Sequence, residues 1–361
     1  MPKPSPAVAA ILPEVSAWLD QLRHPQGGYR YALQAYHPQC GEATAAAVGV
    51  LRELGLLDQM TAEERKALTD QLKSYQQDDG SFHDPVLTEE DRISANHPWI
   101  KIDDHLAGVC EQALAQLGEG PRLKNTTPPI YDLSGDVQKL IRSLDHQTCP
   151  WGRCHNVAFS LLWYRMRHGL IHTSDAQIDM AYRMIEQEMI NPVDGMPGAV
   201  DHPMDNRLAG YYMLTFAYLP FNRPMPNPEA AIDLIIAATD DAGCIGDKGL
   251  CHIFDAIYSL NVVGRQLNWQ YRFEEASQAA SRVAEFLLRE HRKPDGGFSY
   301  DTDRSPRHQN FIRANPGIPQ SDLQGTLMSL ACLNIIDRFR QRMWHEDYLN
   351  PWVQRLSTQA G

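Results

Sequence analysis

The sequence predicts an all-α protein, an (α/α)6 barrel (toroid) of six helical hairpins with DGG-type turns. Helical periodicity dominates the chain, and strand-like alternation is almost absent. A glycine-containing turn recurs six times, each time after a polar amphipathic segment and before an apolar segment rich in small residues. Six small-residue helices can pack side by side inside a barrel, while six outer helices need only one apolar stripe each. The alternative, an open α-solenoid, favours a more even period and capping repeats.

The outer helices are expected over the polar amphipathic segments. These are 6–23, 62–77, 134–145, 175–190, 227–239 and 273–292. The inner helices are expected to begin at 40, 104, 154, 205, 251 and 322, where small and apolar residues start to dominate. We interpret the chain as one domain, 1–361.

The six turns connect each outer segment to the inner segment that follows it. They read HPQGGYRY (24–31), QQDDGSFHDP (76–85), HQTCPWGR (146–153), NPVDGMPGAV (191–200), TDDAGCIGDKG (239–249) and KPDGGFSYDTD (293–303). Glycine is expected to take up positive φ where the outer helix ends. An aromatic residue (Tyr29, Phe82, Trp151 or Phe298) is expected to fold back onto the domain, so the acids of these turns are mainly architectural. The long stretches 81–103 and 299–321 are expected to be loops over one mouth of the barrel.

Composition excludes several functional classes. The net charge of −12 argues against nucleic acid or an anionic membrane surface as a partner. No apolar run is long enough for a transmembrane helix or a secretory signal, so a cytoplasmic protein is expected. The seven scattered cysteines suit reduced thiols better than a disulfide framework. No phosphate-binding glycine loop, GxSxG or HExxH motif occurs, so we expect a small-molecule substrate and no cofactor. The sequence does not define an oligomeric state.

The candidate site lies where the inner helices begin. Parallel inner helices would gather their N-termini at one end of the barrel, where unpaired N–H groups favour negative charge. The polar residues at that level include Cys40 and Glu42 and the candidate catalytic set, which comprises Asp103, Asp104, His105, Cys154, His155, Cys251, His252 and Asp322. The candidate substrate-binding residues are Trp99, Trp151, Asp205, Asn206, Phe298, Tyr300, Arg304 and Phe311. This convergence of polar groups in one concavity favours an active site.

Each of these residues also has a purely structural interpretation. Asp104, Asp205 and Asp322 fit simple helix N-caps. Cys154 and Cys251 fit small buried fillers, and His155 and His252 fit hydrogen-bond donors to nearby carbonyls. In contrast, a functional cysteine at a helix N-terminus would have its pKa lowered toward the thiolate.

The turns QQDDGSF and KPDGGFSY resemble the repeats of squalene-hopene cyclases, and the chain therefore resembles the terpene cyclase and protein prenyltransferase superfamily. In WIKIDDHLAG, residues 101–104 are similar to the DxDD motif of class II terpene cyclases, with Lys101 at the first position. The resemblance implies that Asp103 is the proton donor, while Asp104 takes the last acidic position.

The stretch GDKGLCHIFDAIYSL is similar to the zinc-binding segment of the protein prenyltransferase β subunits, with Cys251 at the cysteine position and Gly249 at the aspartate position. This resemblance adds a zinc ion, held by Cys154, His155 and His252, as an alternative to a metal-free site.

Three functions remain open at this point. The first is a terpene cyclase/isomerase-like enzyme (an isomerase or lyase), with aromatic residues stabilising a cation. The second is a carbohydrate-active hydrolase or lyase, whose anionic substrate would suit Arg304, Arg307, His308 and Arg313. The third is a non-catalytic binding module.

Overall fold

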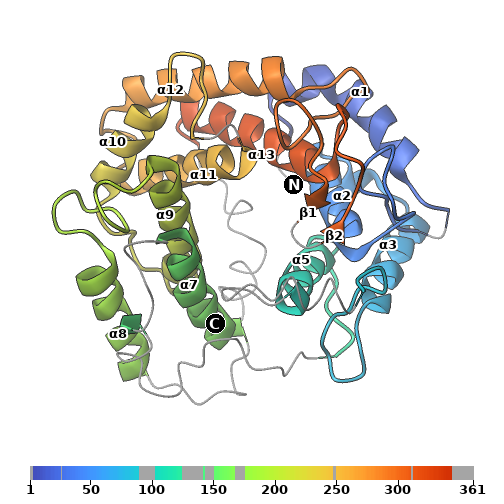
Figure 1. The fold of residues 1–361 in the computed structure, drawn as a ribbon, viewed down its shortest axis with the longest axis horizontal. Helices are drawn as coiled ribbons and strands as arrows, with labels where there is room; N and C mark the ends of the chain where they lie inside the picture. Colours follow the sequence, from blue (N-terminus) through green and yellow to red (C-terminus); the bar gives the residue numbers. More distant parts are fainter. Residues whose placement is uncertain are drawn as a thin grey trace. The chain divides into compact units, whose positions relative to one another are not determined.

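The structure is a computed structural model that describes residues 3–25, 27–88, 102–123, 141–142, 150–166, 175–246, 249–309 and 312–343, with side chains undescribed at 102–104, 159–166 and 175. Within these ranges it is almost entirely helical (Figure 1). Every expected inner segment forms an α-helix. These are α2 (Gly41–Glu53), α5 (Ile102–Gln116), α7 (Pro150–Met166), α9 (Met204–Tyr218), α11 (Leu250–Gln266) and α13 (Leu323–Arg340).

Five of the expected outer segments are also helical. They form α1 (Pro6–Leu22), α3 (Ala62–Ser74), α8 (Asp175–Met184), α10 (Pro228–Ala238) and α12 (Phe273–Phe286). The sixth, 134–145, lies outside the described residues except at 141–142. Two short 3₁₀-helices, η1 (Leu57–Gln59) and η3 (Leu219–Phe221), follow α2 and α9. Helices α8 and α12 end in the π-helical turns η2 (Ile185–Met189) and η4 (Leu287–His291), respectively.

Local sequence explains where the outer helices begin. Ser5 caps α1, because its hydroxyl accepts a hydrogen bond from the N–H of Val8, and Pro6 occupies the first helical position. At the start of α3, Thr61 and Glu64 form a reciprocal capping box. These helix starts therefore follow from capping residues at fixed spacing in the sequence.

The glycine turns share one backbone device. In five of them an isolated antiparallel bridge closes the turn: Arg23–Tyr29, Gln76–Phe82, Ile190–Pro197, Thr239–Ile245 and Arg292–Phe298. A glycine with positive φ lies inside each bridge, as expected (Gly27, Gly80, Gly195, Gly243 and Gly296). The aromatic residues Tyr29, Phe82 and Phe298 are at most 1% exposed, which confirms that they fold back.

The turn expected at 146–153 differs from this pattern. Residues 143–149 lie outside the described part, and helix α7 already begins at Pro150. Proline is favoured at the first helical position because its missing N–H would be unpaired there anyway. Trp151 is therefore helical, and Cys154 and His155 lie in the second turn of α7 rather than at its start.

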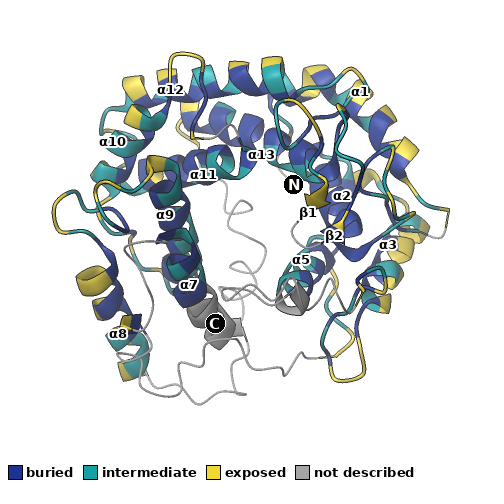
Figure 2. Ribbon diagram, viewed as in Figure 1, coloured by how far each residue is buried: buried dark blue, intermediate teal, exposed yellow. Residues whose placement is uncertain are grey.

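The helices group into two compact units. Unit 1 comprises Met1–Thr127 and Ala284–Arg338, and unit 2 comprises Pro128–Val283 and Phe339–Gly361. In unit 1, α2 packs against α5 and α3; in unit 2, α9 packs against α7 and α11, and α10 packs against α11 and α9. Figure 2 shows that α2 is buried almost throughout, whereas α3 and α8 carry exposed residues. The expected division into buried inner and amphipathic outer helices therefore holds within each unit.

One short hairpin lies in the expected loop 299–321 of unit 1. Strands β1 (His308–Gln309) and β2 (Ile312–Arg313) pair antiparallel, with His308 opposite Arg313 and Gln309 opposite Ile312. Strands of two residues are too short to show an alternating pattern, so the sequence indicated only a loop.

Candidate functional site

In unit 1 the first turns of α2 and α5 are joined by an acid–histidine pair. Oε1 of Glu42 lies 2.8 Å from Nδ1 of His105. Glu42 is 7% exposed and His105 is half-buried. Burial alone would lower the pKa of His105, but the Glu42 carboxylate outweighs it and raises that pKa. The Glu42 carboxylate therefore favours the protonated form of the His105 imidazole.

Two further groups surround the start of α2. The Asp84 carboxylate accepts hydrogen bonds from the N–H of Gly41 at 2.6 Å and from that of Val86 at 3.2 Å. Burial nevertheless raises the pKa of Asp84. Cys40 caps α2 through its sulfur, but burial also raises the pKa of its thiol. The expectation that a cysteine at an inner-helix start becomes a thiolate is therefore wrong for Cys40, because desolvation exceeds the effect of the helix N-terminus.

Asp322 lies fully buried at the start of α13. Its carboxylate accepts hydrogen bonds from the N–H of Gly325 at 2.7 Å and of Tyr300 at 2.8 Å, and from the hydroxyl of Tyr31 at 3.2 Å. Burial raises the pKa of Asp322 to about 7, although these hydrogen bonds oppose the shift. The geometry matches the N-cap interpretation, since Asp322 joins α13 to two neighbouring turns.

In unit 2 a second acid–histidine pair joins α9 to α11. Oδ2 of Asp205 lies 3.4 Å from Nδ1 of His252, and both side chains are mostly buried. Next to it, Oδ1 of Asn206 accepts a hydrogen bond from the N–H of Trp151 at 3.3 Å, which joins α9 to α7. Gly246 approaches so closely that a Cβ there would lie 2.6 Å from Oδ2 of Asp205. These two contacts thus bring the first turns of α7, α9 and α11 together.

Four half-buried aromatic side chains follow this pair along α9 and α11. The ring of Tyr212 contacts Phe216, Phe254 and Tyr258 edge-on, with centroid distances of 5.2, 5.7 and 5.4 Å. We call Tyr212, Phe216, Phe254 and Tyr258 the aromatic wall. Tyr212 is seven residues after Asp205, so both lie on one face of α9. Sequence analysis did not single out these aromatics, although their spacing of four residues within each helix is visible.

The remaining predicted residues are distributed as follows. Asp103 and Asp104 have helical backbones in the first turn of α5; because α5 begins at Ile102, Asp104 lies inside the helix and is not its N-cap. Phe298 is fully buried, Tyr300 is half-buried and Arg304 is exposed beside Asp303. Cys154 is 1% exposed, while His155 and Cys251 are half-buried. Trp99 and Phe311 lie outside the described residues.

Two further findings concern the described side chains and helices. Within that part of the chain, no group of three or more His, Cys, Asp or Glu side chains is placed to hold a metal ion. Likewise, none of the described helices is long and apolar enough to cross a membrane.

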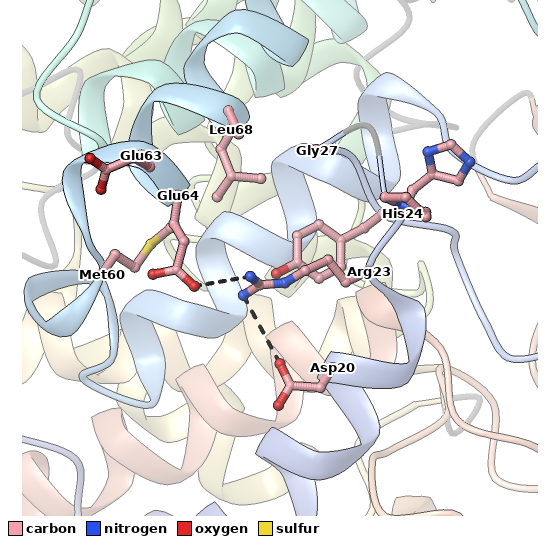
Figure 3. Close-up of a pocket in the computed structure, with 11 residues that line it drawn as sticks. Asp20, Arg23, His24, Gly27, Met60, Glu63, Glu64 and Leu68 are labelled. Atoms are coloured by element: carbon pink, nitrogen blue, oxygen red, sulfur yellow. Dashed lines mark hydrogen bonds and ion pairs between the residues drawn. The ribbon is translucent and has the colours of Figure 1, made fainter.

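A surface pocket in unit 1 lies apart from these pairs (Figure 3). It is formed by the end of α1 and the start of α3 and is lined by Asp20, Arg23, His24, Pro25, Gly27, Tyr29, Met60, Glu63, Glu64, Ala67 and Leu68. Arg23 binds Glu64 at 3.0 Å and lies 4.0 Å from Asp20. None of the predicted site residues lines this pocket.

Comparison with known proteins supports the repeat interpretation. Residues 10–94 match the family described as prenyltransferase alpha-alpha toroid domain, which confirms the resemblance to the terpene cyclase and prenyltransferase superfamily. No curated protein sequence matches the chain.

Three solved structures are similar over almost the whole chain. The first is an α-1,6-mannanase from Salegentibacter sp. HEL1_6, in an inactive variant with two consecutive aspartates replaced by asparagine and in complex with α-1,6-mannotriose. It is 10% identical to this chain, covers 92% of this chain and 99% of its own, and has a TM-score of 0.51. A polysaccharide lyase (13% identity, 94% and 100% coverage) has a TM-score of 0.48. A type II terpene cyclase from Scytonema (13% identity, 93% and 99% coverage) has a TM-score of 0.46. Together, the family match and the likeness to the mannanase confirm the all-α toroid fold class.

Proposed function

We propose that this protein is a terpene cyclase/isomerase-like enzyme that uses acid/base chemistry on a small, unsaturated, isoprenoid-type substrate. The observation that carries the proposal is the aromatic wall directly following the Asp205–His252 pair in unit 2. Aromatic faces stabilise a carbocation, and a histidine oriented by a carboxylate is suited to remove a proton from a carbon beside that cation. The match of residues 10–94 to the prenyltransferase toroid family supports the same substrate class.

The proposed reaction is an isomerisation that needs no co-reactant. A protein acid adds a proton to one carbon of a C=C bond, and the positive charge develops on the other. Nε2 of His252, whose Nδ1 faces Asp205, then takes a proton from a neighbouring carbon and a new C=C bond forms. The cyclase resemblance implies Asp103, in the first turn of α5, as an alternative donor, and the D103N variant tests that alternative separately.

Incubation in D2O tests the proposal. The full chain is incubated with linear isoprenoid alkenes and their diphosphates, and the products are analysed by mass spectrometry. An isomer carrying one solvent deuteron on carbon is expected. The variants H252A and F254L should lower its formation by about 10²–10⁴-fold and about 10-fold, respectively. Y36L, which alters an exposed tyrosine of unit 1, serves as the control. The absence of deuterated product, or full activity of H252A, would exclude this function.

A carbohydrate-active hydrolase or lyase is the second candidate. It is favoured by the fold likeness to the mannanase. The mannanase variant in which two consecutive aspartates are replaced is inactive, and Asp103 and Asp104 of this chain are also consecutive. Aromatic side chains can stack on sugar rings as well as on cations. With α-1,6-mannooligosaccharides in H2¹⁸O, a hydrolase transfers ¹⁸O to the new reducing end, whereas a lyase leaves an unsaturated product without ¹⁸O. D103N and D104N should abolish either reaction.

The third candidate is a non-catalytic binding module. Its distinguishing prediction is that alanine replacements at Cys154, His155, Cys251 and Asp322 change only stability.

A further inference from the structure

Asp255 is a buried acid that the predicted site did not include. It lies in the middle of α11 and is 4% exposed. Its carboxyl group forms no hydrogen bond or ion pair with any described residue. An ionised carboxylate in such surroundings is strongly disfavoured, and burial alone raises the pKa of Asp255 well above its ordinary value. Burial therefore favours the neutral carboxylic acid form of this side chain over the carboxylate.

Other buried aspartates of the chain behave differently. Asp84 accepts two backbone N–H groups, and Asp322 accepts two backbone N–H groups and a hydroxyl. Both have an evident structural role, since they tie a helix start to a neighbouring turn. No described residue donates a hydrogen bond to Asp255, and a buried polar group without such a partner needs a reason other than stability.

The position of Asp255 suggests that reason. It follows His252 by three residues and precedes Tyr258 by three, so helical periodicity places it between these two residues around the surface of α11. The hydroxyl of Ser259, four residues further on, is fully buried and has no hydrogen-bond partner among the described residues. Two polar side chains one turn apart on α11 thus have no hydrogen-bond partner among the described residues, and Asp255 is three residues from Tyr258 of the aromatic wall.

We propose that Asp255 is a catalytic residue, the proton donor to an unsaturated apolar substrate lying against the aromatic wall; this rests on the proposed function. The O–H bond of the Asp255 carboxyl breaks as a C–H bond forms at one alkene carbon, and the cation develops on the adjacent carbon. The new carboxylate faces that cation and is re-protonated from water after His252 has removed the second proton. Protons and electrons balance without an oxidant or reductant.

The test compares D255N, D255E and D201N with the unmodified chain. Asp201 is an exposed aspartate of unit 2, so D201N is the control. D255N should lower deuterium incorporation by about 10²–10⁴-fold while its Tm stays within a few degrees of the unmodified value. D255E, which keeps a carboxyl group, should restore part of the activity. At pH 7, the infrared difference spectrum between the unmodified chain and D255N should show the carbonyl band of a protonated carboxylic acid, whereas the difference spectrum against D201N should not.

The outcomes separate the two proposals. If D255N keeps full turnover, or if the infrared band is missing from the unmodified chain, the donor role of Asp255 is overturned while the proposed function stands. If the unmodified chain turns over no isoprenoid at all, the proposed function is overturned, and the donor role falls with it. If D255N does not fold, D255E provides the test. A folded D255E that shows the infrared band of a protonated carboxyl group but has low activity would also overturn the donor role.

Discussion

The carboxylate of Glu42 lies 2.8 Å from the imidazole of His105 and keeps the pKa of that histidine above its usual value in spite of burial. The relationship recurs in unit 2, where Asp205 faces His252 at 3.4 Å. In both cases the acid is the second residue of one inner helix and the histidine lies in the first turn of the next. The same acid–histidine pairing thus occurs at corresponding helix positions in both units.

The first prediction concerns the charge of His105. In E42Q the imidazole loses its carboxylate partner, so its pKa should fall, measurable from the histidine ring protons by NMR. A raised folded pKa stabilises the protein below the unfolded value of about 6.5, and this stabilisation is lost as pH rises through the folded pKa. E42Q should therefore lower the Tm more at pH 6 than at pH 9. The exposed Glu63 offers a control in E63Q, and an equal effect at both pH values would contradict the argument.

The second prediction concerns Asp322. Its pKa in the folded protein is about 7, against about 3.9 in an unfolded chain. The folded state therefore binds the extra proton, and stability should fall between about pH 4 and pH 7, by at most about 1.4 kcal/mol per pH unit. D322N keeps a capping oxygen for Gly325 but cannot ionise, so urea unfolding should show a shallower pH dependence. D70N, at an exposed aspartate of α3, should leave the slope unchanged.

The third prediction concerns the turn before α9. Arg207 is 2% exposed and binds both carboxylate oxygens of Asp194, at 2.6 and 2.7 Å, and the carbonyl of Pro197. Replacing Arg207 by alanine leaves these acceptors unpaired and should lower the free energy of unfolding by about 3–5 kcal/mol. R272A, which removes an exposed ion pair with Asp233, should have little effect in the same denaturation experiment. If R207A and R272A lower the free energy of unfolding by similar amounts, the structural role of the Arg207–Asp194 pair is refuted.

The fourth prediction compares two glycines. Gly243 has φ +92, and a Cβ there would lie 2.0 Å from the carbonyl oxygen of Arg282. Gly108 lies within α5, where a Cβ would meet nothing within 4 Å. G243A should therefore lower the Tm by several degrees, whereas G108A should raise it, because alanine favours the helix by about 1 kcal/mol over glycine. A neutral G243A would show that the turn can rearrange.

The helices could be predicted from the sequence, whereas several side-chain contacts at the helix starts could not. Small-residue segments after glycine turns gave all six inner helices, because packing and turn chemistry act within one repeat. The start of α7 was misplaced because Pro150 was interpreted as part of a turn. Asp84 was missed because its partner, Gly41, belongs to a different repeat. The raised pKa of the Cys40 thiol likewise depends on burial, which neighbours in sequence do not determine.

The bridged turns have a consequence for how such a chain can evolve. Four of the five bridges join residues six apart, and the fifth joins residues seven apart. Each turn is therefore closed by its own backbone and is nearly the same size in every copy. A helical hairpin that is duplicated or exchanged would therefore bring its own closed turn with it. Shuffling of hairpins at the gene level can then change the residues at the helix starts without changing the turns that connect the helices.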